Sequence, residues 1–447
     1  MTKTIIRLKC KPTIGVNVGA IPLPIISRLK EEFSFIQGNY AILVLSWIIM
    51  DFAMELPGTY YSLYVVDPAL GGTETILGII GFASFLALAL VQFPGGYLAD
   101  RHGRRWLIST MTFGVALSYI FYALAPSWHF ILVGAMVGSL CLIYQPALLA
   151  MTADSLPSKK RGMGFSIITL ITRVATTPAP AVAAFMVTVY EFVPGMRICY
   201  FIVVALFLTA ATLRSRLRET VGEGGSIDRR EFVSSYPRAI REGVAVWKKV
   251  PRSMYYLFLS NIVGTFGFAL CQLLFNVYAV DTFDEFGNIV HESVLHISTV
   301  DWAILGMFLF VTMIVFAIPV GKLVDKVGRK IPILLGLGLI IPSMVLFVQG
   351  DLLKLYIAMP LVGVAQILMM AGFSALQADL VPRGQRGKII GSSNFVNYLI
   401  MALGMLAGGF IYEHVSPQLP FLIPIVFTIP EILIILFLVH EPEKREE

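Results

Sequence analysis

The chain contains 447 residues, of which 57% are hydrophobic and only 14% are charged. Water-soluble domains carry about 25% charged residues, so this composition excludes a soluble globular protein and indicates that the lipid bilayer is the solvent. The formal net charge is +6, but the basic residues do not gather on a soluble module as they do in nucleic-acid-binding proteins. We therefore expect a protein surrounded by membrane lipids, with no nucleic-acid partner.

Twelve stretches along the chain are apolar and long enough to cross a bilayer, which takes about 20 residues. Most of them run without the polar–apolar alternation of barrel strands. The sequence therefore predicts an all-α membrane protein with twelve transmembrane helices. The predicted spans are residues 39–66, 75–98, 105–125, 128–151, 164–189, 197–213, 254–280, 300–320, 332–349, 352–378, 390–412 and 419–439.

Lysine and arginine fall almost entirely on one side of these spans. With twelve spans, both termini and every even-numbered connection share a side, and that side holds nearly all of the 34 basic residues. The other side has only Arg197 and Lys354, and Arg173 lies within a span. Positive residues favour the cytoplasmic face, so we expect both termini in the cytoplasm and a multi-pass protein of the cell membrane.

Two different motifs each occur twice, at one and the same offset. The stretch PGGYLADRHGRR at 94–105 matches PVGKLVDKVGRK at 319–330, and ADSLPSKKRG at 153–162 matches ADLVPRGQRG at 378–387. This agreement indicates an internal duplication. The expected organisation is a cytoplasmic tail at 1–37, a six-helix bundle at 38–213, a cytoplasmic linker at 214–253, a second six-helix bundle at 254–439 and a cytoplasmic tail at 440–447.

The first repeated stretch has the pattern G-x-x-x-D-R/K-x-G-R-R/K, and in this the chain resembles the major facilitator superfamily of secondary transporters. The pattern is complete twice, as Gly96, Asp100, Arg101, Gly103, Arg104 and Arg105 and as Gly321, Asp325, Lys326, Gly328, Arg329 and Lys330. The resemblance implies two pseudo-symmetric six-helix bundles that expose a central site to each side of the membrane in turn. It also implies that the repeated motif forms a cytoplasmic gate.

The residue types of the motif suit such a gate. Gly96 lets a neighbouring helix approach closely, and Asp100 can accept charge-assisted hydrogen bonds from arginines or from a helix N-terminus. Gly103 permits the sharp turn between two helices, and the basic residues anchor the loop at the inner face. The resemblance implies that this gate holds the halves together when the transporter opens outward and separates when it opens inward.

Three ionisable residues lie inside predicted spans, where each costs about 2.5–3.5 kcal/mol on insertion scales and marks a functional position. Asp51 and Glu55 are one helical turn apart in the first span, so they share a helix face, which Trp47 continues. Arg173 lies in the fifth span at a similar depth. Two acids near one arginine leave one carboxyl group unmatched, so we predict that these three residues couple transport to protons. The alternative is a static ion pair between the first and fifth spans.

Neutral polar residues complete the predicted site. In the family that the chain resembles, the first, fourth, seventh and tenth spans line the central cavity. The repeat has no charge at the positions equivalent to Asp51, Glu55 and Arg173, so we expect the second half to supply neutral polar groups. The predicted cavity residues are Trp47, Tyr144, Gln145, Asn261, Gln272, Asn276, Gln366, Asn394, Asn397 and Tyr398. Taken singly, each is more often a hydrogen bond between helices than a substrate ligand.

These features favour a secondary active transporter that moves a small organic solute by alternating access and couples this movement to protons. Antiport of drugs or amphipathic compounds against protons is preferred, because acids in the first span without matching charge in the second half resemble multidrug exporters. The alternative is a proton-coupled uptake symporter for a metabolite such as a sugar or an organic acid. A more remote alternative is a non-transporting membrane sensor on the same scaffold.

Other functional classes have little support in the sequence. No arrangement of serine, histidine and acidic residues indicates an enzyme, and the nucleotide-binding pattern GxxxxGK[ST] does not occur. Cys10, Cys141, Cys199 and Cys271 have neither metal-ligand spacing nor the spacing of a disulfide framework. We therefore expect a transporter that functions as a monomer, with no enzymatic activity, cofactor or metal.

Overall fold

The computed structural model of the chain describes residues 35–157, 160–220, 250–283, 286–381 and 386–441, with Pro237, Arg241, Ala245, Trp247 and Lys248 between them. Most of the predicted linker at 214–253, and parts of the predicted tails at 1–37 and 440–447, therefore lie outside the described residues. The same holds for the side-chain positions of three gate residues, Gly96, Asp100 and Arg101.

Twelve helical segments of the described chain are long and apolar enough to cross a membrane, which confirms the predicted fold class. The helices are α2 (Gly38–Gly58), α3 (Tyr61–Val66), α4 (Glu74–His102), α5 (Arg104–Ala123), α6 (Trp128–Cys141), η1 (Leu142–Tyr144), α7 (Gln145–Asp154), α8 (Arg161–Thr176), α9 (Ala179–Val189), α10 (Phe192–Arg214), α12 (Arg252–Cys271), α13 (Phe275–Ala279), α14 (Thr299–Val327), α15 (Lys330–Val348), α16 (Leu352–Leu380), α17 (Arg386–His414) and α18 (Leu419–Leu438). The strands are β1 (Thr282–Phe283) and β2 (Ile289–His291).

Proline and glycine divide several spans into two helical pieces. The predicted first span, 39–66, is not continuous: α2 ends with Pro57 and Gly58, and α3 follows. Pro146 lies in the first turn of α7, and Pro180 lies in the first turn of α9. Proline has no N–H to donate and clashes with the preceding turn, which favours a helix end or a helix start at these positions. It does not end every helix, since α14, α15, α16 and α18 continue past internal prolines.

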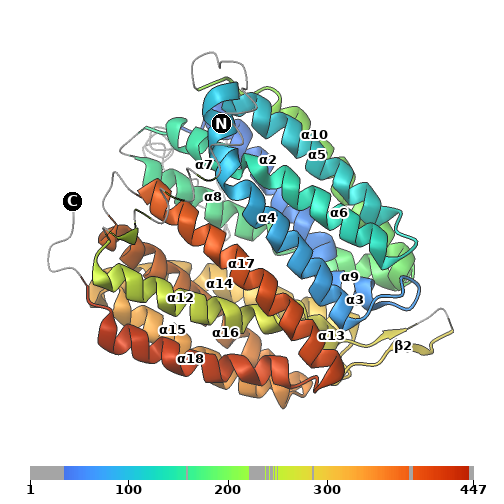
Figure 1. Cartoon of the computed structure of the whole chain (residues 1–447). Coiled ribbons are helices and arrows are strands. Elements are labelled where there is room, and N and C mark those ends of the chain that lie inside the picture. The colour runs from blue at the N-terminus through green and yellow to red at the C-terminus, as the bar shows by residue number, and fades with distance from the viewer. Residues whose placement is uncertain are drawn as a thin grey trace, which may run out of the picture.

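The helices form two groups, with α2 to α10 (blue to green) in one and α12 to α18 (yellow to red) in the other (Figure 1). Between the groups, α4 packs along α17, and α9 packs against α14. The two copies of the first repeated motif lie where α4 meets α5 and where α14 meets α15. We call this side of the bundle the motif end. The antiparallel strands β1 and β2 lie on the opposite side, the hairpin end.

The largest buried cluster contains side chains of both halves and lies at the hairpin end. Tyr64 and Leu77 of the first half belong to it, as do Tyr278 and Phe347 of the second. The other clusters of the described residues each stay within one half. In the described part of the chain, the two halves therefore share a buried core only at the hairpin end.

Glycines bring α4 and α17 into backbone contact at the boundary between the halves. A Cβ atom at Gly78 would lie 2.6 Å from Met405 O, and a Cβ atom at Gly409 would overlap Glu74 O. Helices in a membrane associate through close packing, which small residues permit. We call this boundary the α4–α17 seam, and it positions the halves relative to each other near the hairpin end.

A matched pair of glycine substitutions in α17 tests the seam. Gly409→Ala should lower the free energy of unfolding by about 1–3 kcal/mol, because the added methyl group forces the helices apart. Gly391→Ala is the control, since a Cβ atom there has no neighbour within 4 Å, and it should be neutral or stabilise the helix by about 0.5–1 kcal/mol. Thermal unfolding of the purified variants in detergent measures both, and equal shifts would contradict the close contact.

Candidate functional site

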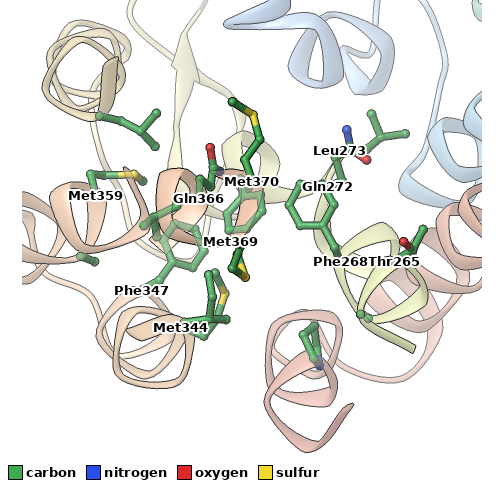
Figure 2. Close-up of a pocket in the computed structure, with 18 of the residues that line it drawn as sticks. Thr265, Phe268, Gln272, Leu273, Met344, Phe347, Met359, Gln366, Met369 and Met370 are labelled. Atoms are coloured by element: carbon green, nitrogen blue, oxygen red, sulfur yellow. The ribbon is translucent and has the colours of Figure 1, made fainter. Parts of the chain in front are cut away.

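A cavity of about 840 Å³ lies between the two halves (Figure 2). The first half contributes Glu55, Thr59 and Tyr61 to its lining, while α12, α14, α15, α16 and α18 provide most of the wall. Ligand pockets usually measure about 300–1,000 Å³, so this cavity can accommodate a drug-sized molecule.

The cavity wall is mostly apolar and rich in aromatic and methionine side chains. Figure 2 shows Met344, Met369 and Phe268 around the same space, to which Gln272 and Gln366 add polar groups. The aromatic and methionine residues of the lining are Tyr61, Phe268, Phe275, Trp302, Phe310, Met344, Phe347, Met359, Met369, Met370, Phe373, Met401 and Phe427. The described lining also contains the carboxyl groups of Glu55 and Glu431, and it contains no lysine, arginine or histidine. Such a wall suits a ligand with an apolar body and a positive charge.

The structure brings some of the predicted site residues together and separates others. The cavity lining includes Glu55 and the predicted polar residues Asn261, Gln272, Asn276 and Gln366. Other predicted residues lie outside the described lining: Trp47, Asp51, Tyr144, Gln145, Arg173, Asn394, Asn397 and Tyr398. Tyr398, for example, packs against Phe85 of α4, with ring centroids 6.1 Å apart. A role in substrate binding stays a prediction for all of them.

Asp51 and Glu55 share one face of α2, and both are partly buried. Arg173 of α8 interacts electrostatically with both acids. Among the described residues, however, no ion pair within 4 Å joins Arg173 to either carboxyl group. The static ion pair considered from the sequence is therefore not formed in this structure.

Arg214 is a buried charge that the sequence analysis misplaced. The predicted linker begins at residue 214, yet Arg214 is the last residue of α10 and is 0% exposed. Its Nε donates to Ser46 Oγ (3.0 Å), and its Nη1 donates to Thr112 Oγ1 (3.0 Å) and Tyr144 OH (3.2 Å). Its Nη2 has no hydrogen-bond partner among the described residues, and the guanidinium interacts electrostatically with Asp51. The unbroken run FLTAATLR is the signal that could have placed it inside the span.

Glu431 corrects the expectation that the second half supplies only neutral polar groups. It lies in α18, within the predicted span 419–439, and is 5% exposed. An acid in so apolar a stretch is itself a signal of function. The comparison of repeat positions misses it because that comparison considers only the equivalents of Asp51, Glu55 and Arg173.

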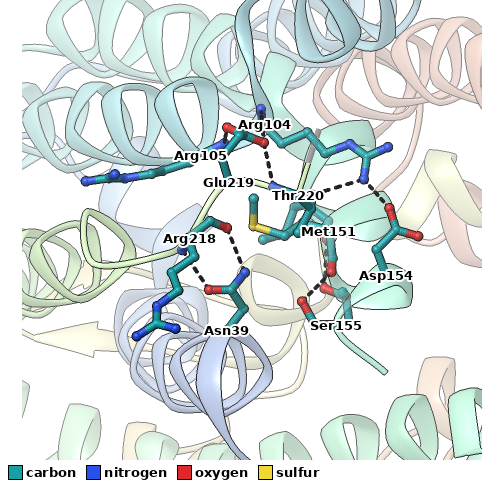
Figure 3. A network of polar contacts seen from close by, with 11 residues as sticks. Asn39, Arg104, Arg105, Met151, Asp154, Ser155, Arg218, Glu219 and Thr220 are labelled. Atoms are coloured by element: carbon teal, nitrogen blue, oxygen red, sulfur yellow. Dashed lines mark hydrogen bonds and ion pairs between the residues drawn. The ribbon is translucent and has the colours of Figure 1, made fainter. Parts of the chain in front are cut away.

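At the motif end, Arg104 and the start of α5 are held by acids of the same half (Figure 3). Arg104 Nη1 forms an ion pair with Asp154 Oδ2 and donates to Thr220 Oγ1 at 3.3 Å. The Glu219 carboxylate accepts the backbone N–H groups of Arg104 (3.2 Å) and Arg105 (2.9 Å). Glu219 thus satisfies two N–H groups that a helix N-terminus leaves unpaired.

The second half repeats this arrangement at the equivalent positions. Arg329 Nε lies 3.2 Å from Asp379 Oδ2, and Glu441 Oε1 accepts the backbone N–H groups of Arg329 (2.8 Å) and Lys330 (2.7 Å). Asp325, one helical turn before Arg329 in the chain, has its Oδ1 3.6 Å from Arg329 Nη1. With described residues, Arg104 and Arg329 bond only within their own halves, so a gate between the halves stays a prediction. Glu219 and Glu441 lie outside the repeated motifs, and the sequence analysis missed both.

Glycine is required where each motif turns from one helix into the next. Gly103 has φ +87° and Gly328 has φ +95°, a region that side chains rarely allow. A Cβ atom would also lie 2.7 Å from the Glu219 carboxylate at the first position and 2.8 Å from the Glu441 carboxylate at the second. The predicted turn role of Gly103 agrees with this geometry.

At the hairpin end, several hydrogen bonds join the halves directly, including one from the backbone N–H of Thr75 to Glu413 Oε2 (2.8 Å). Tyr60 OH donates to Thr299 O, and Asn276 Nδ2 donates to Thr59 O at 3.1 Å. Asn276 is 8% exposed and also belongs to the cavity lining. Together with the shared core, these bonds close the bundle at the hairpin end in this structure.

Asp281 fixes the loop that carries the β-hairpin. Its Oδ1 accepts the backbone N–H and the hydroxyl of Ser293, both at 2.7 Å, and its Oδ2 lies 3.1 Å from His296 Nδ1. Burial opposes ionisation of Asp281, but the hydrogen bonds from Ser293 and His296 outweigh it and hold the pKa of Asp281 below its ordinary value.

Two six-helix halves around a shared cavity are the architecture of a secondary transporter. A family model described as "Major Facilitator Superfamily" matches residues 43–287 and 257–447, and the chain belongs to this superfamily of transporters. The family indicated by the repeated motif is therefore confirmed.

Solved transporter structures share the fold over most of the chain. The nucleoside transporter NupG has a TM-score of 0.68 at 14% identity and covers 89% of this chain and 100% of its own. A POT family transporter in complex with 5-aminolevulinic acid has a TM-score of 0.67 at 14% identity, and the match covers 89% of this chain and 94% of that transporter. The human organic anion transporter MFSD10 (TETRAN) has a TM-score of 0.61 at 18% identity, covering 89% and 98%. At these identities the likeness concerns the fold alone.

Curated relatives match over shorter stretches. Multidrug resistance protein 1 of Bacillus subtilis is 30% identical over 138 residues, which is 31% of this chain and 35% of the relative. Quinolone resistance protein NorA of Staphylococcus aureus is 31% identical over 125 residues, 28% of this chain and 32% of NorA. The Na(+), Li(+), K(+)/H(+) antiporter of Planococcus maritimus is 25% identical over 246 residues, which is 52% of this chain and 54% of the relative. The chain thus spans from about a third to about half of the length of these relatives.

Glu219 and Glu441 cap equivalent helices at the motif end, so replacing either one should destabilise the protein to a similar extent. Glu219→Gln and Glu441→Gln should each lower the free energy of unfolding by about 1 kcal/mol, because each removes a charged acceptor from a helix N-terminus. Glu292→Gln, which changes an exposed acid at the hairpin end, serves as the control. Thermal unfolding in detergent gives the comparison, and cap variants that match the control would contradict the assigned role.

The lowered pKa of Asp281 predicts a pH-dependent contribution to stability. Ionised Asp281 stabilises the fold above about pH 4, the pKa of an unfolded aspartate, and this contribution is lost as the pH falls through the lower pKa of the folded state. Asp281→Asn should therefore cost about 1 kcal/mol at pH 7 and progressively less below pH 4. Unfolding midpoints of both proteins across this pH range provide the check, and a constant difference would refute it.

Proposed function

We propose that this transporter exports amphipathic organic cations in exchange for protons. The observation that carries the proposal is the chemistry of the cavity, where aromatic and methionine side chains accompany two carboxyl groups and the described lining has no basic residue. Aromatic faces attract cations, and a carboxylate removed from water needs a positive partner. A ligand with an apolar body and a positive charge meets both requirements.

Asp51 and Glu55 supply the proton coupling in this proposal, with Arg173 as their partner. An ionised carboxyl group inside a span is costly, so each acid requires a proton or a nearby cation. Arg173 and Arg214 both interact electrostatically with Asp51, whereas Arg173 is the one arginine that acts on Glu55. Glu55, which faces the cavity, is therefore the better placed of the two acids to exchange its proton when a substrate cation arrives.

The conformational cycle follows from the two ends of the bundle. The excess of basic residues supports a cytoplasmic position for the motif end. With that orientation, closure at the hairpin end corresponds to an inward-open state. In the outward-open state, the repeated motifs form the gate that joins the halves at the motif end. The Arg104–Asp154 and Arg329–Asp379 pairs then keep each half rigid while the halves move against each other.

Uptake of an organic acid has less support. An anionic substrate needs a cationic group in the site, but Arg173 and Arg214 lie outside the described lining of the cavity. The names of the relatives, each matched over part of the chain, support the proposal in two ways. Two of them concern drug resistance, and one concerns exchange of cations for protons.

Transport by the purified protein in liposomes that enclose a pH-sensitive dye tests this function. A lipophilic cation such as tetraphenylphosphonium should drive proton flux, while a neutral sugar and an organic anion should not. Asp51→Asn and Glu55→Gln should each reduce the cation-driven flux to about a fifth or less, as expected for the loss of about 1–3 kcal/mol of coupling. Glu292→Gln, outside the cavity, should leave it unchanged. Flux driven by the sugar or the anion would contradict the proposed substrate, and unchanged flux in both acid variants would contradict the coupling role.

A further inference from the structure

The cavity contains a carboxyl group that coupling through Asp51 and Glu55 does not use. Glu431 lies in a spanning helix, is 5% exposed and lines the cavity. In the described part of the chain, its carboxyl group has no hydrogen-bond or ion-pair partner and no charged neighbour, so burial alone determines how easily it ionises. A buried carboxylate without a partner is strongly unfavourable, so this group needs a proton or a cation from outside the protein.

The helix opposite Glu431 is shaped to admit the carboxyl group. A Cβ atom at Gly264 of α12 would lie 2.6 Å from Glu431 Oε2 and 2.7 Å from Oε1, so a side chain there would displace the carboxyl group. Thr428, one turn before Glu431, donates its hydroxyl to Pro424 O at 2.9 Å. Its hydroxyl hydrogen is therefore not available to the Glu431 carboxyl group. Phe427 lines the cavity beside Thr428 and offers an aromatic face to a bound cation.

Among the side chains that the structure describes, no charge on the neighbouring helices compensates Glu431. It lies on α18, which packs against α12, α15 and α17. The titratable residues of these helices whose side chains are described are Arg252, Tyr255, Tyr256, Cys271, Lys330, Tyr398, Tyr412, Glu413 and His414, and none of them acts on Glu431 electrostatically. Lys330 instead donates to Leu436 O (2.6 Å) and Val439 O (3.0 Å), near the motif end of α18.

We propose that Glu431 binds the positive group of the substrate, so that a proton and the substrate cation compete for this one carboxyl group. The idea rests on the proposed exchange of cations for protons and adds the residue of the second half that recognises the cation. When the cation arrives, the protonated carboxyl group releases its proton to water, and the carboxylate forms an ion pair with the cation. When a proton returns, the ion pair separates, and no other bond forms or breaks.

Two probes of similar shape but different charge separate recognition of the cation from shaping of the cavity. Tetraphenylphosphonium carries a permanent positive charge, whereas triphenylphosphine oxide is neutral. Binding of each to purified wild type and to Glu431→Gln is measured in detergent, and proton release on addition of tetraphenylphosphonium is measured in weak buffer. The substitution should weaken tetraphenylphosphonium binding about 30-fold, since it removes one partner of a buried charge pair, and should reduce proton release. Binding of triphenylphosphine oxide should not change.

A second variant changes the surroundings of Glu431 and keeps its charge. Gly264→Ala places a methyl group against the carboxyl group and should weaken tetraphenylphosphonium binding selectively. Gly391→Ala, in a position without close neighbours, is the matched control and should bind both probes like wild type.

The outcomes distinguish this inference from the proposed function. If Glu431→Gln binds tetraphenylphosphonium like wild type, Glu431 does not recognise the cation, while cation-driven proton flux that depends on Asp51 and Glu55 would still stand. If Glu431→Gln loses both probes equally, Glu431 acts by shaping the cavity and the inference is wrong. If wild type binds no cation, both the inference and the proposed substrate class fail.

Discussion

An ionised side chain inside a bilayer needs hydrogen-bond partners or an opposite charge, and this requirement governs where charge occurs in the interior of this protein. Arg214 shows one solution, in which three hydroxyl groups surround a guanidinium that is cut off from water. Asp51 and Glu55 show another, since arginines of other helices act on them from beyond direct contact. Glu431 has neither kind of partner among the described residues. Charges that the protein itself compensates are suited to holding helices together, whereas an uncompensated charge is suited to exchange with a ligand.

The two halves resemble each other in the ion pairs and helix caps at the motif end, but they differ in what they contribute to the cavity. Arg104 with Asp154 and Arg329 with Asp379 form the same ion pair at equivalent positions, and Glu219 and Glu441 cap equivalent helices. The cavity, in contrast, draws most of its wall from the second half. A transporter needs two rigid bodies of similar shape in order to alternate, but its substrate is not symmetric, so only the bracing benefits from repetition.

The sequence was sufficient for the fold because its signals are local. A run of about 20 apolar residues predicts a span whatever its neighbours are, and the repeated motif identifies the family. The helix break after Pro57 and the burial of Arg214 were harder to predict from the sequence, since both depend on how a span ends. Arg214 follows an apolar run without interruption, and only packing against Ser46, Thr112 and Tyr144 distinguishes it from the exposed arginines that follow.

The site was predicted only in part, for a related reason. Asn261, Gln272, Asn276 and Gln366 line the cavity, but Asn394, Asn397 and Tyr398 of α17 do not. Polarity indicates that a residue avoids lipid, whereas the tilt and rotation of its helix decide whether it faces a cavity or another helix. The packing of α17 on α4 accounts for the difference at Tyr398, whose ring contacts Phe85.

The α4–α17 seam has a consequence for the membrane around the protein. Its closest contacts are between backbones at Gly78 and Gly409, beside the contact of Tyr398 with Phe85 and the hydrogen bond from Thr75 N–H to Glu413. Lipid tails solvate helix surfaces about as well as other helices do, so the seam is held by packing rather than by the hydrophobic effect. In the proposed transport cycle, opening the hairpin end would exchange these contacts for contacts with acyl chains. The balance between the two states of the transporter should therefore depend on how tightly the surrounding lipids pack, and a change of bilayer composition alone would shift it.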